Sequence, residues 1–475
     1  MTAAATSVRT IADLRDRRAL VIGLARSGTA AARFLVGAGA RVTAYDRRLG
    51  VDLPDVGSLA EGHVELRLGA SPEEVRGLLH GADLVVTSPS ISLHLPTTDA
   101  WLREALGAAQ RRGVEIVSEV ELFLRLTRAR VLGVTGTKGK TTTTALIGAI
   151  LTGAGIPHLV GGNIGRPLIE EVTRLTDADW AVLELSELQL PTITRGADLA
   201  VYTNVAADHL DRHASQQAYR AVKARLAALS AGSGRVLLNA DDPGCVELGA
   251  TLPAGAVLWY GLDETRPDLA GRVREGWLEV QGVRILPVDE VPLRGAHLLA
   301  DVLAAGVAAS LLGVSGEMIA AGIRGFEGVP HRMELIGEWG GVRWVNDSQA
   351  TIPMAAVAGI RAFAPAPVVL IAGGSDKGLD YAEYARTIVE RCRAAVLIGE
   401  TAPTLAALLG GRVPVRRAAD MDDAVAAASA AARPGDVVLL APAAASFDMF
   451  ADYAARGDAF RRAVLAIRPG GGASA

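Results

Sequence analysis

The chain has 475 residues, of which 50% are hydrophobic and 21% are charged, and its formal net charge is −4. A chain of this length predicts two or three domains, because single domains run to roughly 100–200 residues. The composition excludes a disordered or fibrous protein, and the lack of a basic excess argues against nucleic acid as a partner.

The first segment, residues 1–118, is predicted to be a Rossmann-like α/β domain. A buried strand over 18–23, a helix over 27–39 and a strand over 41–46 form a βαβ beginning, and further strands are predicted at 82–87 and 114–117. The loop Gly23-Leu-Ala-Arg-Ser-Gly28 has the form of a dinucleotide fingerprint whose middle glycine is Ala25. This motif alone is also compatible with a plain strand-to-helix turn.

A second domain, residues 119–328, opens with a strand over 130–135, a glycine-rich loop and a helix from Lys140. The segment Gly133-Val-Thr-Gly-Thr-Lys-Gly-Lys-Thr-Thr142 is a P-loop variant whose spacing is one residue off the common pattern. Its backbone N–H groups are expected to surround a phosphate, with Lys140 on the outer phosphates and Thr141 or Thr142 on Mg²⁺.

Later strands of this domain carry candidate metal ligands. Strands are predicted at 180–185, 199–204 and 235–239, a helix at 216–230, a β-rich stretch at 256–288 and a helix at 300–312. Glu184 ends the first of these strands and is expected to serve Mg²⁺, whereas Glu187 is expected to face solvent. His209 lies in a cluster of Asp and His that suits a second divalent ion.

A third α/β domain, residues 329–475, follows a linker predicted at 322–330. Its strands are predicted at 342–346, 368–373, 395–399 and 436–441, each followed by a helix. Polar motifs follow three of these strands, at Asn346-Asp-Ser348, Ala372-Gly-Gly-Ser-Asp-Lys377 and Ala441 to Asp448. We expect them to gather at one edge of the sheet, where open α/β folds bind ligands.

Lysine is rare in this chain. Of 48 basic residues only four are lysines, namely Lys138, Lys140, Lys223 and Lys377. A lysine kept in an arginine-rich chain indicates chemistry that a guanidinium cannot perform, although a solvated surface position is the ordinary alternative for Lys223.

Neither a membrane span nor a disulfide framework is indicated. The apolar stretches are short and rich in Ala, Gly and Thr, and the first 20 residues lack the apolar core of a secretory signal. The chain has two cysteines, Cys245 and Cys392. We expect a cytoplasmic monomer.

The combination of motifs resembles the Mur ligases, and most closely the members of that family that add glutamate. Besides the two glycine-rich loops it includes the following segments: Gly161-Gly-Asn-Ile-Gly165, Glu184-Leu-Ser-Glu-Leu-Gln189, His209-Leu-Asp-Arg212, Gly328-Val-Pro-His-Arg332, Asn346-Asp-Ser348, Ser446-Phe-Asp448 and Arg456-Gly457. Their order and spacing, rather than any one of them, carry the resemblance.

The resemblance implies a three-domain enzyme that adds glutamate to UDP-N-acetylmuramoyl-L-alanine through an acyl phosphate, with ATP and two Mg²⁺ ions. It implies these roles: Ser27, Asp46 and Arg47 for UDP; Asn163 for the muramoyl-alanine part; Gly136, Thr137, Lys138, Gly139, Lys140, Thr141, Thr142, Arg332 and Asp347 for ATP; Thr141, Glu184 and His209 for Mg²⁺; and Thr351, Lys377, Ser446 and Tyr453 for glutamate. Lys223 matches a lysine that the family carbamylates, so that its carbamate positions Mg²⁺. Lys140, Glu184, His209 and Lys223 are thus the expected catalytic set.

The chain departs from the family pattern at Leu298, Asp301, Gln349 and Ile352. Three other interpretations stay open: a related amino-acid ligase that is L-glutamate-specific or folylpolyglutamate-like, an inactive homologue, and an NAD-dependent oxidoreductase built on Gly23 to Asp46. Phosphate release from ATP that requires both substrates would separate them.

Overall fold

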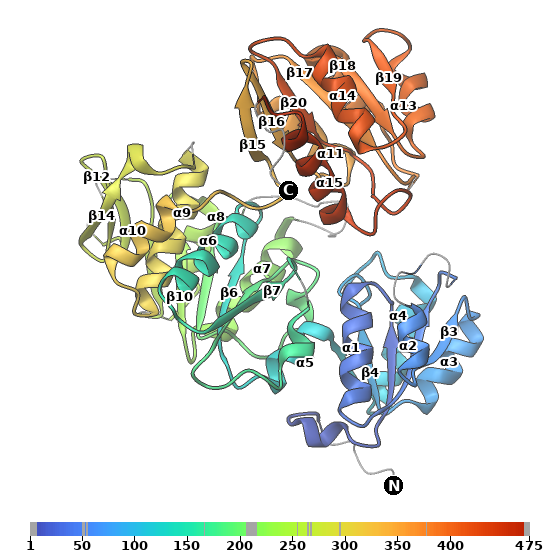
Figure 1. The fold of residues 1–475 in the computed structure, drawn as a ribbon. Coiled ribbons are helices and arrows are strands. Elements are labelled where there is room, and N and C mark those ends of the chain that lie inside the picture. Colours follow the sequence, from blue (N-terminus) through green and yellow to red (C-terminus); the bar gives the residue numbers. More distant parts are fainter. Residues whose placement is uncertain are drawn as a thin grey trace. The chain divides into compact units, whose positions relative to one another are not determined.

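The computed structural model describes residues 7–49, 53, 56–165, 167–205, 216–253, 255–263, 266, 268–293, 296–376 and 378–469, with only the backbone described at 56, 216–218, 296 and 297. These residues form an α/β protein with three sheets (Figure 1). The chain divides into two compact units, Met1–Phe326 and Glu327–Ala475. No helix within the described ranges is long and apolar enough to cross a membrane.

The first sheet is a parallel five-stranded sheet in the order β3-β2-β1-β4-β5. Its strands are β1 (Arg18–Ile22), β2 (Arg41–Asp46), β3 (Glu65–Leu68), β4 (Leu84–Thr87) and β5 (Glu115–Ser118), and its helices are α1 (Arg26–Gly37), α2 (Val56–Glu61), α3 (Pro72–Gly81), α4 (Ala100–Arg111) and α5 (Glu119–Leu126), preceded by the short η1 (Ile11–Leu14). Val21 and Leu20, neighbours on β1, belong to different apolar clusters on opposite faces of the sheet. Burial of both faces explains the continuous apolar strands that the sequence shows.

The second sheet has nine strands in the order β14-β13-β12-β11-β10-β9-β6-β8-β7. Its strands are β6 (Arg130–Thr135), β7 (His158–Gly162), β8 (Trp180–Glu184), β9 (Leu199–Tyr202), β10 (Arg235–Asn239), β11 (Val257–Tyr260), β12 (Gly271–Arg274), β13 (Trp277–Val280) and β14 (Val283–Pro287); its helices are α6 (Lys140–Gly153), α7 (Gln216–Ser230), α8 (Pro243–Gly249), α9 (Ala296–Leu311) and α10 (Gly316–Arg324), with η3 (Leu168–Glu171), η4 (Leu190–Thr192) and η5 (Val288–Glu290). Strands β6 to β12 pair in parallel, and β12, β13 and β14 form an antiparallel meander.

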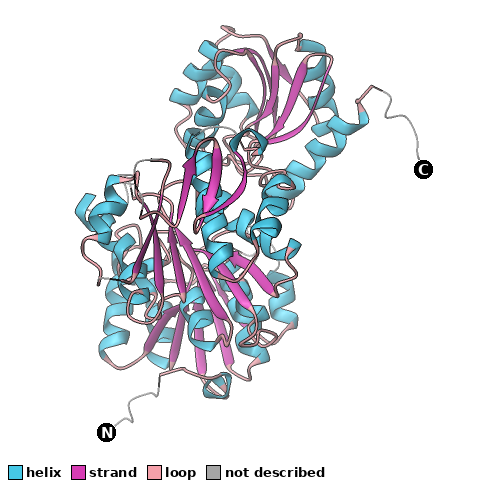
Figure 2. Ribbon diagram, turned by 90° about the vertical axis from the view of Figure 1, so that its left-hand side faces the viewer, coloured by secondary structure: helices cyan, strands magenta, loops and turns pink. Residues whose placement is uncertain are grey.

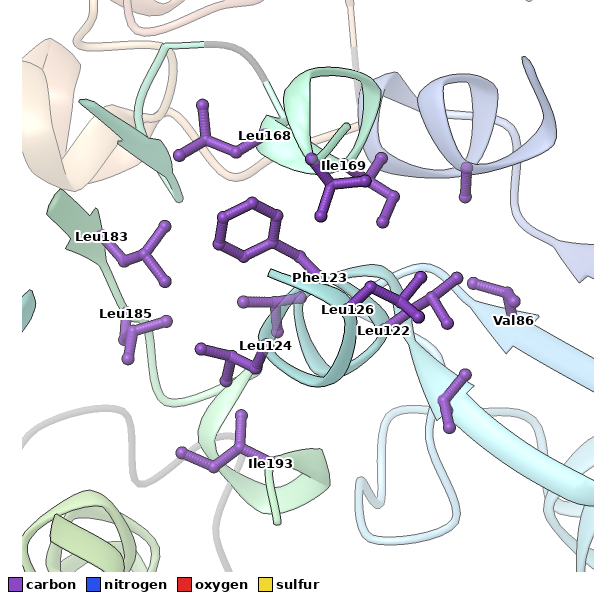
Figure 3. Close-up of a cluster of buried hydrophobic side chains, with 14 of the residues drawn as sticks. Val86, Leu122, Phe123, Leu124, Leu126, Leu168, Ile169, Leu183, Leu185 and Ile193 are labelled. Atoms are coloured by element: carbon purple, nitrogen blue, oxygen red, sulfur yellow. The ribbon is translucent and has the colours of Figure 1, made fainter. Parts of the chain in front are cut away.

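A shared core joins the first two sheets within one unit. Helix α5 places Leu122, Phe123 and Leu124 among buried residues of both, with Val86 of β4 on one side and Leu183 of β8 on the other (Figure 3). Polar contacts reinforce the junction: the hydroxyl groups of Ser118 and Thr192 lie 2.7 Å apart, and a carboxylate oxygen of Glu121 accepts from the backbone N–H of Thr194 at 2.8 Å. The first two sheets are therefore fixed to each other.

The second unit contains a six-stranded sheet in the order β15-β16-β20-β17-β18-β19, with helices on both faces (Figure 2). Its strands are β15 (Glu334–Trp339), β16 (Val342–Asn346), β17 (Val368–Gly373), β18 (Cys392–Ile398), β19 (Val415–Arg417) and β20 (Val437–Leu440), and its helices are α11 (Pro353–Arg361), α12 (Ala382–Arg391), α13 (Ala402–Leu409), α14 (Met421–Ala431) and α15 (Tyr453–Ala466). Strand β15 is antiparallel to β16, and the remaining pairs are parallel. Leu370 and Ile371 of β17 belong to separate apolar clusters, one on each face.

The predicted linker at 322–330 begins too early. Gly322 lies inside α10, and a side chain there would meet the backbone and side chain of Ile150 on α6. Glycine permits this close helix contact, so its presence marks packing rather than a hinge. The boundary between the units falls after Phe326.

Candidate active site

The first candidate site is a cavity of about 580 Å³ at the carboxyl ends of β1, β2 and β4. In a parallel sheet of this order, the crevice where the strand order reverses, between β1 and β4, is the usual place for a ligand. The lining residues include Gly23, Ala25, Tyr45, Asp46, Arg47, Arg48, Ser88, Ser90, Thr97, Thr98 and Asp99. Ser27 lies beside the cavity in the first turn of α1, which begins directly after Ala25.

Asp46 lines the cavity, but it is only 4% exposed and its carboxylate is engaged by hydrogen bonds within the protein. One carboxylate oxygen accepts from the backbone N–H of Leu24 at 2.7 Å, and both accept from the guanidinium of Arg48, at 3.0 and 2.9 Å. Burial alone would raise the pKa of Asp46, but the hydrogen bonds from Arg48 and Leu24 outweigh it and lower the pKa. Asp46 thus fixes the Gly23–Gly28 loop and orients Arg48.

Arg48 was not predicted as a site residue from the sequence, which assigned Arg47 to UDP instead. A signal existed, because an arginine two residues after a strand-ending aspartate can fold back onto it. Its guanidinium lines the cavity and provides a positive charge for an anionic or aromatic ligand.

The P-loop lies between β6 and α6. Gly136 and Gly139 have φ of +151° and +84°, and a side chain at Gly139 would come within 2.2 Å of a carboxylate oxygen of Asp301 on α9. Both positions need glycine for this reason. Asp301, one of the departures from the family pattern, is buried directly against this glycine-rich loop.

Lysine Nζ atoms converge on one carbonyl of this loop. Lys140 donates to the backbone oxygens of Gly136 and Thr137 at 3.0 and 2.9 Å, and Lys223 donates to the same Gly136 oxygen at 2.9 Å. Lys223 is fully buried and also lies over the ring of Tyr219 at 5.6 Å. A solvated surface position for Lys223 is therefore wrong.

The hydroxyl-bearing side of the loop is also ordered. Thr141 and Thr142 are buried in the first turn of α6, and the hydroxyl oxygens of Thr137 and Tyr219 lie 3.0 Å apart. The side chain of Lys138 is exposed. Thr141 and Thr142 thus lie at the helix start, which is where P-loop proteins place the hydroxyl that binds Mg²⁺.

The loop after β9 holds the P-loop from the other side. The amide of Asn204 accepts from the backbone N–H of Lys138 and donates to its carbonyl, both at 2.9 Å, and Thr203 donates its hydroxyl to the same carbonyl. No sequence motif predicts this role of Thr203 and Asn204, because it depends on β9 being the sheet neighbour of β6.

Glu184 ends β8 with its carboxylate inside the protein, at 1% exposure. Its Oε1 accepts from the side-chain amide of Asn163 at 2.7 Å, and its Oε2 is a buried oxygen with no hydrogen-bond partner among the described residues. An ionised oxygen left in this state is costly unless a cation meets it. Asn163, expected to contact substrate, here orients Glu184.

Glu187 does not face solvent as the sequence suggested, since it is only 6% exposed. The reason is the tight turn after β8, where Ser186 donates its backbone N–H to Gln189 at 3.0 Å and folds the following residues inward. His209, the expected ligand of a second ion, lies outside the described residues.

The residues present fit a divalent cation. The unpartnered oxygen of Glu184 and the threonine hydroxyls at the start of α6 are oxygen ligands of the kind that Mg²⁺ prefers. No group of three His, Cys, Asp or Glu side chains that could hold an ion occurs in the parts of the chain that the structure covers. In nucleotide sites Mg²⁺ is commonly held by one or two carboxylates together with substrate phosphate oxygens and water.

The second unit gathers its polar motifs as predicted. Because β16, β20 and β17 are adjacent, the loops that follow them meet, and Ser375 pairs with Ala445 across two of these loops. Ser446 is 2% exposed, and Tyr453 begins α15. Lys377 lies outside the described residues.

Asp347 is buried at 6% exposure, and burial raises its pKa to about 6. The backbone N–H of Met333, 3.1 Å from Oδ1, and the charge of Arg332 oppose this rise. The two residues predicted to hold ATP from this unit are thus electrostatically coupled. Thr351 lies half-buried just beyond, its N–H bonded to the carbonyl of Gln349 at 2.8 Å.

His331 anchors the backbone near the start of the second unit through hydrogen bonds. Its backbone has φ of +63°, its N–H donates to Glu334 at 2.9 Å, and its Nδ1 lies 3.1 Å from the amide nitrogen of Asn346. Since that amide nitrogen is a donor, Nδ1 is the acceptor in this contact. This arrangement fixes the backbone next to Arg332.

Models of Mur ligase domains match three consecutive parts of the chain. The MurD-like N-terminal domain matches residues 17–118, the Mur ligase middle domain matches residues 134–309, and the glutamate ligase domain of Mur ligases matches residues 331–444. The three matches span both units and all three sheets.

Relatives of similar length carry the name UDP-N-acetylmuramoylalanine–D-glutamate ligase. The protein from Solibacter usitatus is 40% identical over 457 residues, which cover 96% of this chain and 99% of the relative. The protein from Symbiobacterium thermophilum is 42% identical over 469 residues, which cover 95% and 98%.

Solved structures share the fold at much lower identity. UDP-N-acetylmuramate-alanine ligase MurC from Thermotoga maritima matches with a TM-score of 0.57 and 16% identity, covering 95% of this chain and 99% of that one. The murein peptide ligase mpl from Psychrobacter arcticus matches with a TM-score of 0.51 and 16% identity, covering 97% and 100%. At such identity the likeness shows the fold alone.

Proposed function

The chain belongs to the Mur ligase family, and from that premise we propose that it joins D-glutamate to UDP-N-acetylmuramoyl-L-alanine with ATP. As a member of this family it is an ATP-dependent ligase that forms a C–N bond. The observation that carries the choice of substrates is the identity of about 40% over nearly the full length to ligases named for D-glutamate.

The cavity of the first sheet is proposed to hold the UDP part of the substrate. Arg48, fixed by Asp46, offers its guanidinium face to the base, and the start of α1 at Ser27 offers backbone N–H groups to the diphosphate. Arg47, also in the lining, adds a second positive charge. Because both oxygens of Asp46 are already engaged, the ribose hydrogen bond of an NAD-dependent oxidoreductase is not favoured.

The P-loop is proposed to hold ATP. The Lys140 ammonium group donates to two backbone carbonyl oxygens of the loop. When a polyphosphate binds, its outer phosphates can replace these carbonyls as partners of the ammonium group. The backbone of Gly136, Thr137, Lys138 and Gly139 forms the cradle, and Thr141 or Thr142 and Glu184 would hold Mg²⁺. When bound, Mg²⁺ supplies positive charge that offsets the charge of the phosphates and of the attacking carboxylate.

The reaction requires two transfers. The carboxylate of the muramoyl-alanine attacks the γ-phosphate and ADP leaves; the amine of glutamate then attacks the resulting acyl phosphate, and phosphate leaves. Lys140 neutralises the phosphoryl group during the first transfer. Water must be excluded from the acyl phosphate until the amine attacks, because hydrolysis would waste the intermediate.

Lys223 and His209 are proposed to complete the site. The Lys223 amine can lose a proton and take up CO₂ to give a carbamate, whereas an arginine stays protonated. Its position under Gly136, within 3.4 Å of the Thr135 hydroxyl, places it beside the phosphate cradle. A second Mg²⁺, with His209 as a ligand, remains a prediction.

The second unit is proposed to bind glutamate and to supply some of the residues that bind ATP. Arg332 and Asp347 are assigned to ATP, and Thr351, Lys377, Ser446 and Tyr453 to glutamate. The division into domains at residues 118 and 328, a monomeric state and a cytoplasmic location likewise remain predictions.

Phosphate release tests this function. Purified protein is expected to release phosphate from ATP only when UDP-N-acetylmuramoyl-L-alanine and glutamate are both present, and to use D-glutamate in preference to L-glutamate. Release with neither substrate, or equal use of both enantiomers, would contradict the proposal. A folylpolyglutamate-like ligase would instead require a folate acceptor.

A further inference from the structure

Arg456 connects two loops that lie at the carboxyl ends of strands in the third sheet. The residue is fully buried in the first turn of α15. Its Nε donates to the hydroxyl of Ser348 at 3.0 Å, and its Nη2 donates to the Ser348 carbonyl at 3.0 Å. Its two Nη atoms also donate to the carbonyl of Ala444 at 3.1 Å, and Nη1 donates to that of Ala445 at 3.0 Å. One guanidinium therefore spans the loop after β16 and the loop after β20.

This guanidinium lacks the usual ionic partner. No carboxylate forms an ion pair with Arg456 within the described part of the chain, and all its acceptors are neutral. Burial lowers its pKa to about 10, while the charges of Asp448 and Tyr384 act in the opposite direction. Burying a cation without a paired anion is costly, so the five hydrogen bonds that Arg456 donates to neutral oxygens must offset the loss of hydration.

The two loops carry the groups assigned to different substrates. Asp347, assigned to ATP, precedes Ser348, and Ser446, assigned to glutamate, follows Ala445. The Ser348 hydroxyl that accepts from Arg456 also donates to the carbonyl of Tyr453 at 2.7 Å, so the start of α15 is tied to the same point.

A third loop rests on the same side chain. A Cβ at Gly374 would lie 3.0 Å from Nη1 of Arg456 and 2.0 Å from the carbonyl oxygen of Ala445. Gly374 begins the loop that leads to Lys377. A shift of the guanidinium would therefore change the positions of all three loops.

We propose that Arg456 is a positioning residue that sets the spacing between the ATP loop and the glutamate loops, so that both substrates depend on it although neither touches it. The proposal rests on the substrate assignments of the proposed function. Arginine suits this task because its planar fork reaches several fixed acceptors at once, whereas lysine offers one nitrogen on a flexible stem.

The test compares Arg456→Met and Arg456→Lys with Arg393→Met. Arg393 is a matched control: its guanidinium forms a two-bond ion pair with Asp436, at 2.6 and 2.9 Å, and both residues lie where β18 and β20 begin, at the opposite edge of the same sheet. Thermal unfolding is measured for each variant, together with KM for glutamate, ATP and the UDP substrate.

Arg456→Met is expected to raise KM for glutamate and for ATP by about tenfold or more, because several hydrogen bonds from a charged donor are lost. KM for the UDP substrate, which is assigned to the other unit, should stay within about twofold. Arg456→Lys should restore part of the loss. Arg393→Met should lower the unfolding midpoint and leave all three KM values within about twofold. If Arg456→Met does not fold, the test is made on Arg456→Lys, in which the KM values for glutamate and for ATP should both rise.

Unchanged KM values for glutamate and ATP in folded Arg456 variants, or changes that match those of Arg393→Met, would overturn the proposal. The wild-type enzyme separates this failure from failure of the proposed function. If wild-type phosphate release requires both substrates but the variants behave like the control, only the role of Arg456 is lost.

Discussion

Replacing Glu184 with glutamine should make the ligand-free protein more stable and abolish its response to Mg²⁺ and ATP. Glu184 is 1% exposed, and its Oε2 has no partner among the described residues. Glutamine keeps the shape and keeps an oxygen to accept from Asn163, but it removes the buried charge. Leaving a buried polar group unsatisfied costs about 1–3 kcal/mol, and more when it is charged. We therefore expect Glu184→Gln to raise the free energy of unfolding by about 1–2 kcal/mol.

Thermal unfolding with and without Mg²⁺ and ATP is the assay. The wild-type midpoint should rise when both ligands are added, because they bind only the folded state. The Glu184→Gln midpoint should start a few degrees higher and then rise little. Glu171→Gln is the control: Glu171 is also a buried acid, but it is paired with Arg174 away from the P-loop. This variant should keep the response to the ligands.

A Glu184→Gln protein that is less stable than wild type without ligands and yet keeps the full response to Mg²⁺ and ATP would refute this reasoning. In that case the unpartnered oxygen would have no link to a cation. Glu184 would be a structural residue that serves only Asn163.

Four further changes test other parts of the site. Lys223→Ala should lower the rate of phosphate release at least about a hundredfold, and short carboxylates should partly restore it; a near-normal rate would remove the carbamate. Gly139→Ala should raise KM for ATP at least about tenfold, because the new Cβ would lie 2.2 Å from a buried carboxylate oxygen, whereas Gly153→Ala, in open space on the same helix, should not. Arg48→Ala should raise KM for the UDP substrate about tenfold and leave KM for ATP unchanged, as steady-state kinetics can show. Asp347 has a pKa raised to about 6, so its contribution to stability is greatest below about pH 4 and is lost as the pH rises through 6. In urea unfolding, Asp347→Asn should remove about 2–3 kcal/mol of that pH dependence. Identical pH profiles of the variant and the wild type would contradict this prediction.

The parallel strands were the most predictable part of the fold. The strands at 41–46, 130–135, 235–239, 342–346 and 368–373 have the predicted bounds, because each is a short, mainly apolar run whose last three residues are buried. Strands β3, β7, β15 and β19 were not predicted. All four lie at sheet edges, where one neighbour is missing. Charged residues interrupt the apolar run in β3, β15 and β19, and β7 ends in two glycines.

The placement of the candidate site groups was predictable where the residues concerned are close in sequence. The P-loop, Glu184 at the end of its strand and the polar loops of the third sheet could be read from local motifs. Arg48, Asn204 and Arg456 could not, because their partners lie across a turn, on a neighbouring strand or on two separate loops. The burial of Lys223 beneath Gly136 likewise depends on the packing of α7 against the sheet, which the sequence of α7 does not reveal.

The transfer of oxygen-18 from substrate to phosphate tests the central claim most directly. UDP-N-acetylmuramoyl-L-alanine labelled in its free carboxylate is incubated with the protein, ATP and D-glutamate, and the released phosphate is analysed by mass spectrometry. If the carboxylate attacks the γ-phosphate, one labelled oxygen appears in each phosphate released. Phosphate without label, formed together with the amide product, would contradict the acyl phosphate route.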